Sequence, residues 1–310
     1  MRIIFMGTPD FAVPSLRALA DAGYKPVAVV TAPDRPKGRG RKVQPSPVKK
    51  AALDLEIRQI LQPESVRDPD FAEAVRAVEA DLQVVVAFRI LPPTVFNAAT
   101  KGAFNLHGSL LPRYRGAAPI HRAVMAGDSL TGVTTFFLKE RVDTGNIILQ
   151  RPLPIGPNDT TGDVHDRMMD LGADAVVDTV RMIERGTAEP LPQDDSAATP
   201  APKVFREQAD IPWGLPAQQV HNHIRGHSPV PGAWTTSPSG TLKVYRSLIA
   251  EGKGTPGEII DTSGRLVVAC GEGAVELVEV KPEGSRSMSA RDYLNGAPLE
   301  AGQVLKVTVS

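Results

Sequence analysis

An asparagine and a histidine stand two positions apart in a largely apolar stretch of the chain. Residues 104–108 read FNLHG, so Asn105 and His107 project from one face if this stretch is an extended strand. Asparagine offers two N–H donors, and histidine can donate a hydrogen bond or accept a proton. Acyl transfer to an amine needs both functions, because an oxyanion must be stabilised and a proton must leave the attacking nitrogen. The pair therefore predicts acyl-transfer chemistry.

A plain structural interpretation of this pair is also available, since a polar strand end can hydrogen-bond to neighbouring backbone. The residues that follow favour a functional interpretation. Ser109 to Pro112 predicts a proline-terminated turn, Arg115 and Gly116 place a cation beside a flexible hinge, and residues 117–120 read AAPI, like a helix start. We interpret residues 105–120 as a shaped binding wall.

A second candidate segment carries positive charge without a carboxylate between residues 35 and 50. Such a run is usually a solvated loop. Two glycines, Gly38 and Gly40, would let this loop conform to a partner, and the charge is concentrated in a chain that is otherwise neutral, which favours a polyanion. The basic residues are Arg35, Lys37, Arg39, Arg41, Lys42, Lys49 and Lys50.

Composition excludes several classes of protein. The 310 residues suit two domains, and 35 basic against 35 acidic residues give no global attraction to nucleic acid. One cysteine, Cys270, rules out a disulfide framework, and its apolar neighbours predict a buried, inert thiol. Because no signal peptide or run of ~20 apolar residues is present, we expect a cytoplasmic protein without membrane contact. We further expect a monomer.

Two common kinds of site are not supported. Gly7 follows the first expected strand, but the second and third glycines of a dinucleotide-binding turn are missing. His221 and His223 are two apart on an expected helix, which does not place them on one face, so we predict no metal.

The elements that must position the candidate residues alternate between strands and helices. Expected strands at 2–6, 26–31, 84–88 and 104–108 are separated by stretches with helical features that begin near 9, 46, 68 and 92. This alternation predicts an α/β fold with a mainly parallel sheet covered on both faces. Residues 134–138 and 147–155 predict two more strands flanking Asp143, and 161–184 predicts a long amphipathic helix.

The last third of the chain has a different character. Prolines and small residues between 189 and 206 predict a linker, and residues 207–310 contain short apolar runs separated by Gly-bearing turns. We therefore expect a catalytic domain at 1–188, a linker at 189–206 and a smaller β-barrel or sandwich domain at 207–310.

Three segments together resemble one known family. The run 105–120, the motif VDTG at 142–145 and the opening RIIFMGTPDF at 2–11 resemble the folate-dependent formyltransferases, and the similarity extends over nearly the whole chain. The resemblance implies a Rossmann-like formyltransferase domain followed by an oligonucleotide-binding-like (OB-like) barrel that binds tRNA. It also implies formyl transfer from 10-formyltetrahydrofolate to the α-amino group of methionyl-initiator tRNA, for translation initiation.

The resemblance assigns roles residue by residue. It implies Asn105, His107 and Asp143 as the catalytic set, although an Asp before Thr-Gly is also common in simple turns. Folate is expected along the turn Ser109, Leu110, Leu111 and Pro112 and the strand end near 86–90. Arg39 matches the family's tRNA-contacting position, and we expect Arg41 and Lys42 to bind tRNA with it.

Two rival functions remain open from the sequence. One is a formyltransferase that acts on a small amine, such as glycinamide ribonucleotide or an amino sugar. The other is a non-catalytic RNA-binding module built on a degenerate enzyme fold. The basic segment and the appended β-rich region favour a tRNA acceptor, and the complete Asn, His and Asp set favours catalysis.

Overall fold

A computed structural model describes residues 1–37, 42–296 and 299–305. The contacts divide the chain into two compact units. Unit 1 contains 1–119, 131–153 and 165–201, and unit 2 contains 120–130, 154–164 and 202–310. Segments 120–130 and 154–164 thus group with the C-terminal third. The domains expected from the sequence are contiguous and do not include this grouping. The domain limits expected from the sequence stay a prediction.

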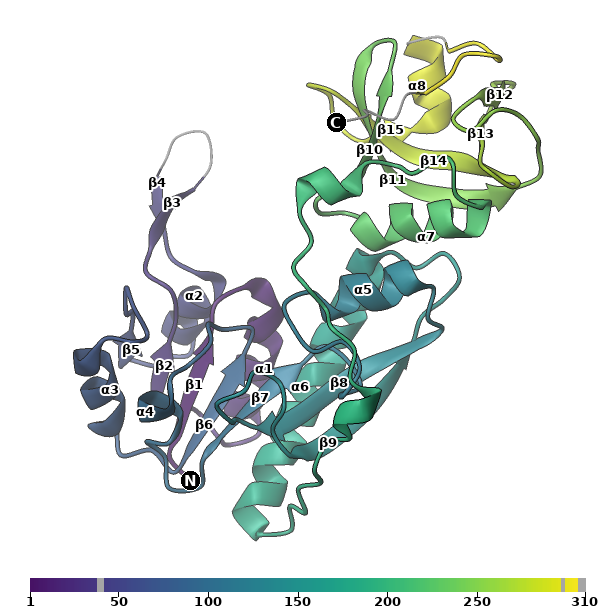
Figure 1. Ribbon diagram of the computed structural model, residues 1–310. Helices are drawn as coiled ribbons and strands as arrows, with labels where there is room; N and C mark the ends of the chain where they lie inside the picture. Colours follow the sequence, from purple (N-terminus) through teal and green to yellow (C-terminus); the bar gives the residue numbers. More distant parts are fainter. Residues whose placement is uncertain (38–41, 297–298, 306–310) are drawn as a thin grey trace. The chain divides into compact units, whose positions relative to one another are not determined.

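Unit 1 contains a seven-stranded sheet in the order β5-β2-β1-β6-β7-β8-β9 (Figure 1). Strands β5, β2, β1, β6 and β7 pair in parallel, whereas β7 and β8 are antiparallel. The strands are β1 (Ile3–Gly7), β2 (Ala28–Val30), β5 (Ile60–Leu61), β6 (Leu82–Val86), β7 (Ala103–His107), β8 (Leu130–Phe137) and β9 (Ile147–Pro154). The predicted mainly parallel α/β architecture is confirmed.

Helices and 3-10 turns follow the strands of unit 1 (Figure 1). They are η1 (Asp10–Ala12), α1 (Val13–Asp21), α2 (Pro47–Asp54), α3 (Pro69–Arg76), α4 (Pro93–Phe96), η2 (Asp195–Ala197) and, from residue 165 onward, α6 (Thr161–Arg185). Helix α5 (Pro119–Ala126) lies almost wholly in segment 120–130 and groups with unit 2. Proline stands at the first or second position of α1, α2, α3 and α4, where its missing N–H costs nothing. The Ser46 hydroxyl caps α2 by accepting from Lys49 N–H at 3.0 Å.

The two faces of strand β7 have different partners. Leu106 points toward α6, because a side chain placed on Gly172 of that helix would meet its Cδ2 atom. Thr135, which pairs with Leu106 in register, hydrogen-bonds to Thr179 of α6 at 2.7 Å. Since side chains alternate along a strand, Asn105 and His107 lie on the face away from α6. The α6 packing therefore fixes which β7 side chains are available for chemistry.

Unit 2 contains an antiparallel half-barrel in the order β10-β11-β14-β13-β12, with β15 beside β14. Its elements are η3 (Arg206–Ala209), α7 (Ala217–His227), β10 (Ala233–Ser237), β11 (Gly240–Ala250), β12 (Ile259–Asp261), β13 (Leu266–Ala269), β14 (Ala274–Pro282), β15 (Met288–Ser289) and α8 (Ala290–Gly296). The core includes Trp213, Val244 and Leu277. The predicted smaller β-barrel-type region is confirmed.

Helix α7 carries polar side chains that are buried by segment 154–164. His221 Nε2 bonds to the Pro157 carbonyl at 2.9 Å, and Arg225 Nη1 donates to the Asp159 carbonyl at 3.0 Å. Because buried polar groups need partners, these bonds tie segment 154–164 to unit 2. Cys270 lies in the same unit, 3% exposed, and burial raises the pKa of its thiol to about 11. The predicted buried, inert thiol is confirmed, since little thiolate forms at neutral pH.

Candidate active site

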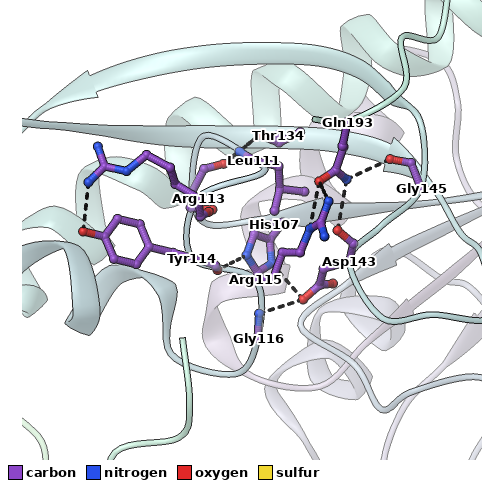
Figure 2. A network of polar contacts seen from close by, with 11 residues as sticks. His107, Leu111, Arg113, Tyr114, Arg115, Gly116, Thr134, Asp143, Gly145 and Gln193 are labelled. Atoms are coloured by element: carbon purple, nitrogen blue, oxygen red, sulfur yellow. Dashed lines mark hydrogen bonds and ion pairs between the residues drawn. The ribbon is translucent and has the colours of Figure 1, made fainter. Parts of the chain in front are cut away.

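His107 ends strand β7 with one ring nitrogen already committed. Its Nε2 atom lies 2.8 Å from the main-chain carbonyl oxygen of Tyr114 (Figure 2). A carbonyl can only accept, so Nε2 must carry the hydrogen. In the neutral ring Nδ1 is then the unprotonated nitrogen, and it faces Asp143 Oδ2 at 3.9 Å. The ring is buried and lies edge-on to Phe136, with centroids 6.5 Å apart.

Asp143 is positioned by the loop between β8 and β9. Its φ of 56° lies in the left-handed region, which Asp tolerates better than most residues. Its Oδ2 atom accepts from Gly116 N–H at 2.9 Å and also faces His107 (Figure 2). A side chain on Gly145 would lie 1.5 Å from the Phe137 carbonyl oxygen, so only glycine fits there. The Asp-Thr-Gly motif thus has a packing reason for its glycine.

The structure brings His107 and Asp143 together and places Asn105 on the same β7 face. Asn105 is half-buried and pairs in register with Val85 and Phe136. The β7 face offers the amide donor of Asn105 and the imidazole of His107, and the neighbouring loop adds the carboxylate of Asp143. The catalytic assignments of these three residues stay a prediction.

The turn expected to bind folate, residues 109–112, is fixed by hydrogen bonds to its own loop and to strands β8 and β9. Ser109 Oγ donates to Arg113 O at 2.6 Å, and Thr134 Oγ1 donates to Ser109 O at 2.6 Å. Leu111 N–H donates to Thr134 Oγ1 at 3.0 Å, while Gln150 Nε2 donates to Leu111 O at 2.8 Å. These bonds make the turn a fixed wall rather than a source of free polar groups. Folate binding by Ser109, Leu110, Leu111 and Pro112 stays a prediction.

The end of β6 presents an apolar edge. Ile90 is 71% exposed, and Phe88 lies beside it, half-buried. The Arg89 guanidinium lies over the Phe88 ring, 5.3 Å from its centroid, and donates to the carbonyls of Pro63 at 2.7 Å and Glu64 at 2.8 Å. Burial lowers the pKa of Arg89. The exposed Ile90 side chain can therefore pack against a flat apolar ring, while one face of Phe88 is shared with Arg89.

The basic segment forms a hairpin where the sequence predicts a loop. Strand β3 (Arg35–Lys37) pairs antiparallel with β4 (Lys42–Gln44) (Figure 1). Lys42 is exposed. Arg39 and Arg41, predicted to bind tRNA, lie outside the described residues.

Lys49 belongs to the base of this hairpin rather than to a free basic surface. Its Nζ atom donates to Asp34 at 2.6 Å and to Gln62 at 2.7 Å. The hydrogen bond from Lys49 helps to hold the pKa of Asp34 below its ordinary value. Because Lys49 has these partners, we do not count it among the cations available to a polyanion.

Two residues that hydrogen-bond around Asp143, Arg115 and Gln193, were not predicted as site residues from the sequence. Arg115 is named there only as a cation beside a hinge, and Gln193 falls in the expected linker. Gln193 Nε2 donates to Asp143 O at 3.0 Å and to Gly145 O at 2.8 Å, and its Oε1 accepts from Arg115 (Figure 2). These bonds join residues 48, 50 and 78 positions apart, so no periodicity or local motif could reveal them.

Among the described residues, no group of three His, Cys, Asp or Glu side chains is arranged to hold a metal ion. The membrane search, over the same residues, found no helix with the length and apolarity needed to cross a bilayer.

Comparison with known proteins gives the family of the chain. The formyl transferase model matches residues 1–180, and the formyl transferase C-terminal domain model matches residues 203–298. The methionyl-tRNA formyltransferase of Chlorobium luteolum is 48% identical over 304 residues, 96% of each chain. That of Moorella thermoacetica is 46% identical over 309 residues, 98% of this chain and 99% of the relative. This chain belongs to the methionyl-tRNA formyltransferase family.

Solved structures share the fold at lower identity. The sugar 3N-formyl transferase WlaRD, solved in the presence of dTDP and 5-N-formyl-THF, has a TM-score of 0.68 at 18% identity, covering 92% of this chain and 99% of its own. HypX from Aquifex aeolicus, in complex with tetrahydrofolic acid, has a TM-score of 0.64 at 18% identity over 99% of this chain and 50% of its own. These structures confirm the fold, and the family matches above confirm the formyltransferase resemblance.

Proposed function

We propose that this chain transfers the formyl group of 10-formyltetrahydrofolate to the α-amino group of methionyl-initiator tRNA, in translation initiation. The observation that carries the proposal is the 48% identity to a methionyl-tRNA formyltransferase over 96% of both chains. The facing Nδ1 and Oδ2 atoms of His107 and Asp143 supply a matching chemistry.

The reaction forms one bond to the formyl carbon and breaks another. The neutral amine of the methionyl group attacks the formyl carbon, the carbonyl oxygen becomes an oxyanion, and the bond to N10 of the folate then breaks. The attacking amine loses one proton and N10 of the folate gains one. The products are tetrahydrofolate and N-formylmethionyl-tRNA, with no net change in protons. No covalent bond to the enzyme is required.

We assign these tasks to the three side chains Asn105, His107 and Asp143. His107 Nδ1 accepts the amine proton, because Nε2–H is held by the Tyr114 carbonyl. Asp143, 3.9 Å away, stabilises the imidazolium that results. A neutral His107 therefore cannot donate to the oxyanion, and this donation falls to the Asn105 amide until Nδ1 is protonated.

The apolar and basic surfaces of unit 1 suit the two proposed substrates, folate and tRNA. The Ile90 edge and the fixed turn at Ser109–Pro112 suit a flat pterin. Lys42, exposed on the hairpin, suits a tRNA phosphate, as do Arg39 and Arg41 by their charge. We extend the proposal to a monomeric, cytoplasmic enzyme, to be checked by light scattering and cell fractionation.

One assay separates this function from its rivals. Purified full chain is incubated with 10-formyltetrahydrofolate and, in parallel, charged initiator tRNA, charged elongator tRNA, glycinamide ribonucleotide or an amino-sugar nucleotide. We expect rapid formylation of charged initiator tRNA, slower formylation of the elongator and little product from the small amines. Preferred formylation of a small amine would contradict the tRNA acceptor, and no formylation at all would contradict an enzyme.

A further inference from the structure

Residues 191–201, here called the strap, pack on the two loops that carry the site. Leu191 pairs with Ile147 through backbone hydrogen bonds of 2.8 and 2.9 Å, directly after the Asp143 loop. Ala201 O accepts from Ala118 N–H at 3.1 Å, and Ala201 N–H donates to Arg115 O at 2.6 Å. The strap therefore contacts both the 114–118 loop and the 143–147 loop, and it belongs to unit 1 by its contacts.

Gln193 is the strap side chain that joins these two loops. Its amide nitrogen donates to the carbonyls of Asp143 and Gly145, and its amide oxygen accepts from Arg115 Nε at 3.0 Å and Nη2 at 2.8 Å (Figure 2). A glutamine amide has two donors and an oxygen with two lone pairs, so all of its capacity is used. Gln193 is half-buried while its neighbours on both sides are exposed.

Both loops that Gln193 joins contain residues that position His107 or Asp143. Arg115 lies between Tyr114, whose carbonyl orients the His107 ring, and Gly116, whose N–H binds the Asp143 carboxylate. The opposite end of the Gln193 amide grips the backbone of Asp143 itself. Tyr114 and Asp143 have φ values of 62° and 56°, which cost energy and persist only where the surrounding structure holds them.

We propose that Gln193 is a positioning residue for formyl transfer, which sets the separation of His107 from Asp143 without touching substrate. This inference rests on the proposed function of the site. A glutamate could accept from Arg115 but could not donate to two carbonyls, and a methionine of similar size could do neither. The neutral amide is therefore required on both sides.

The test compares four full-length proteins with 10-formyltetrahydrofolate and charged initiator tRNA: wild type, Gln193→Met, Gln193→Glu and Asp194→Asn. Asp194 is a matched control on the same strap, since its carboxylate accepts from Ser196 within the strap. Initial rates give kcat and KM for both substrates, and thermal melting gives the folded fraction.

We expect Gln193→Met and Gln193→Glu to lower kcat by roughly 10- to 100-fold, because small misplacement of catalytic groups is costly. Both KM values should stay within about threefold, since Gln193 contacts neither substrate in this account, and Asp194→Asn should match wild type. A merely structural role predicts a lower melting temperature with kcat per folded molecule unchanged, and that result overturns the inference.

A second variant keeps the inference testable if the Gln193 proteins do not fold. Arg115→Lys retains the charge near Asp195 but cannot offer the paired donors to Gln193, so it should also lower kcat with little change in KM. Wild-type kcat in Arg115→Lys, or in a folded Gln193→Met, overturns this inference alone. A wild-type protein that formylates no acceptor overturns the proposed function, and this inference with it.

Discussion

Nδ1 of His107 faces Oδ2 of Asp143 across 3.9 Å, while the opposite ring nitrogen is held by a backbone carbonyl at 2.8 Å. This arrangement makes the ring a base with a defined basic nitrogen. It also places a carboxylate where positive charge develops when the ring takes a proton.

Replacement of the amide donor should lower turnover strongly. Asn105→Ala is expected to reduce kcat on the order of 10²- to 10³-fold, as loss of an oxyanion donor does in other acyl-transfer enzymes. The measurement is formation of formylmethionyl-tRNA under saturating substrates. Asn97→Ala, which changes an exposed residue after α4, is the control and should leave kcat intact. Turnover of Asn105→Ala within threefold of wild type would remove Asn105 from the mechanism.

Neutralising the carboxylate should also slow the reaction. Asp143→Asn can still accept from Gly116 N–H but no longer supplies a negative charge beside His107, so kcat should fall by about 10-fold or more. Asp54→Asn, which breaks an exposed pair with Arg17, should behave as wild type. Equal rates for Asp143→Asn and Asp54→Asn would contradict the role of the charge.

The hairpin predicts a loss that depends on the acceptor. Lys42→Ala and Arg39→Ala should weaken formylation of charged initiator tRNA far more than formylation of a small amine. Each replacement should also reduce the salt slope of tRNA binding by about one when a phosphate contact is lost. Lys101→Ala, an exposed lysine before the start of β7, is the control. Equal losses on both acceptors would speak against tRNA contact by the hairpin.

Unit 2 should become less stable in mild acid. Burial lowers the pKa of His223 and of His227 from 6.5 to about 4. Between these pH values the unfolded state binds more protons than the folded state, so stability rises with pH and is lost as pH falls from 6.5 toward 4. Each histidine contributes up to about 1.4 kcal/mol per pH unit in this window.

Hydrogen exchange of the α7 amides between pH 4.5 and 7 measures this effect, after correction for the intrinsic pH dependence of exchange. The double replacement His223→Gln with His227→Gln should flatten the dependence relative to wild type. An unchanged slope in the double variant would show that other groups carry the acid sensitivity.

Local patterns predict the sheet and the strand face that carries two of the candidate residues. Alternation along residues 104–108 places Asn105 and His107 on one face of a strand, found as β7, and the periodicity of 161–184 matches helix α6 at Thr161–Arg185. The family resemblance, rather than periodicity, supplies Asp143, because its approach to His107 joins the end of β7 to the loop between β8 and β9. The structure adds the distance of 3.9 Å between His107 Nδ1 and Asp143 Oδ2.

Features that depend on distant contacts could not be predicted. Gln193 lies among prolines and small residues, which are typical of a linker, yet its amide binds backbone 48 and 50 residues away. Segment 154–164 groups with unit 2 and bonds to α7, as between His221 and Pro157, while His121 of segment 120–130 bonds to the Val230 carbonyl. The basic composition of the 35–44 region favours a loop over the antiparallel pairing of β3 with β4.

A double-mutant cycle of His107 and Asp143 tests the central claim most directly. Single-turnover formylation of methionyl-initiator tRNA is measured for wild type, His107→Ala, Asp143→Asn and the double variant. Because the carboxylate acts through the imidazole, the double variant should be no slower than His107→Ala alone, within about threefold. Rate losses that multiply in the double variant would show that the two residues act independently and would contradict the account.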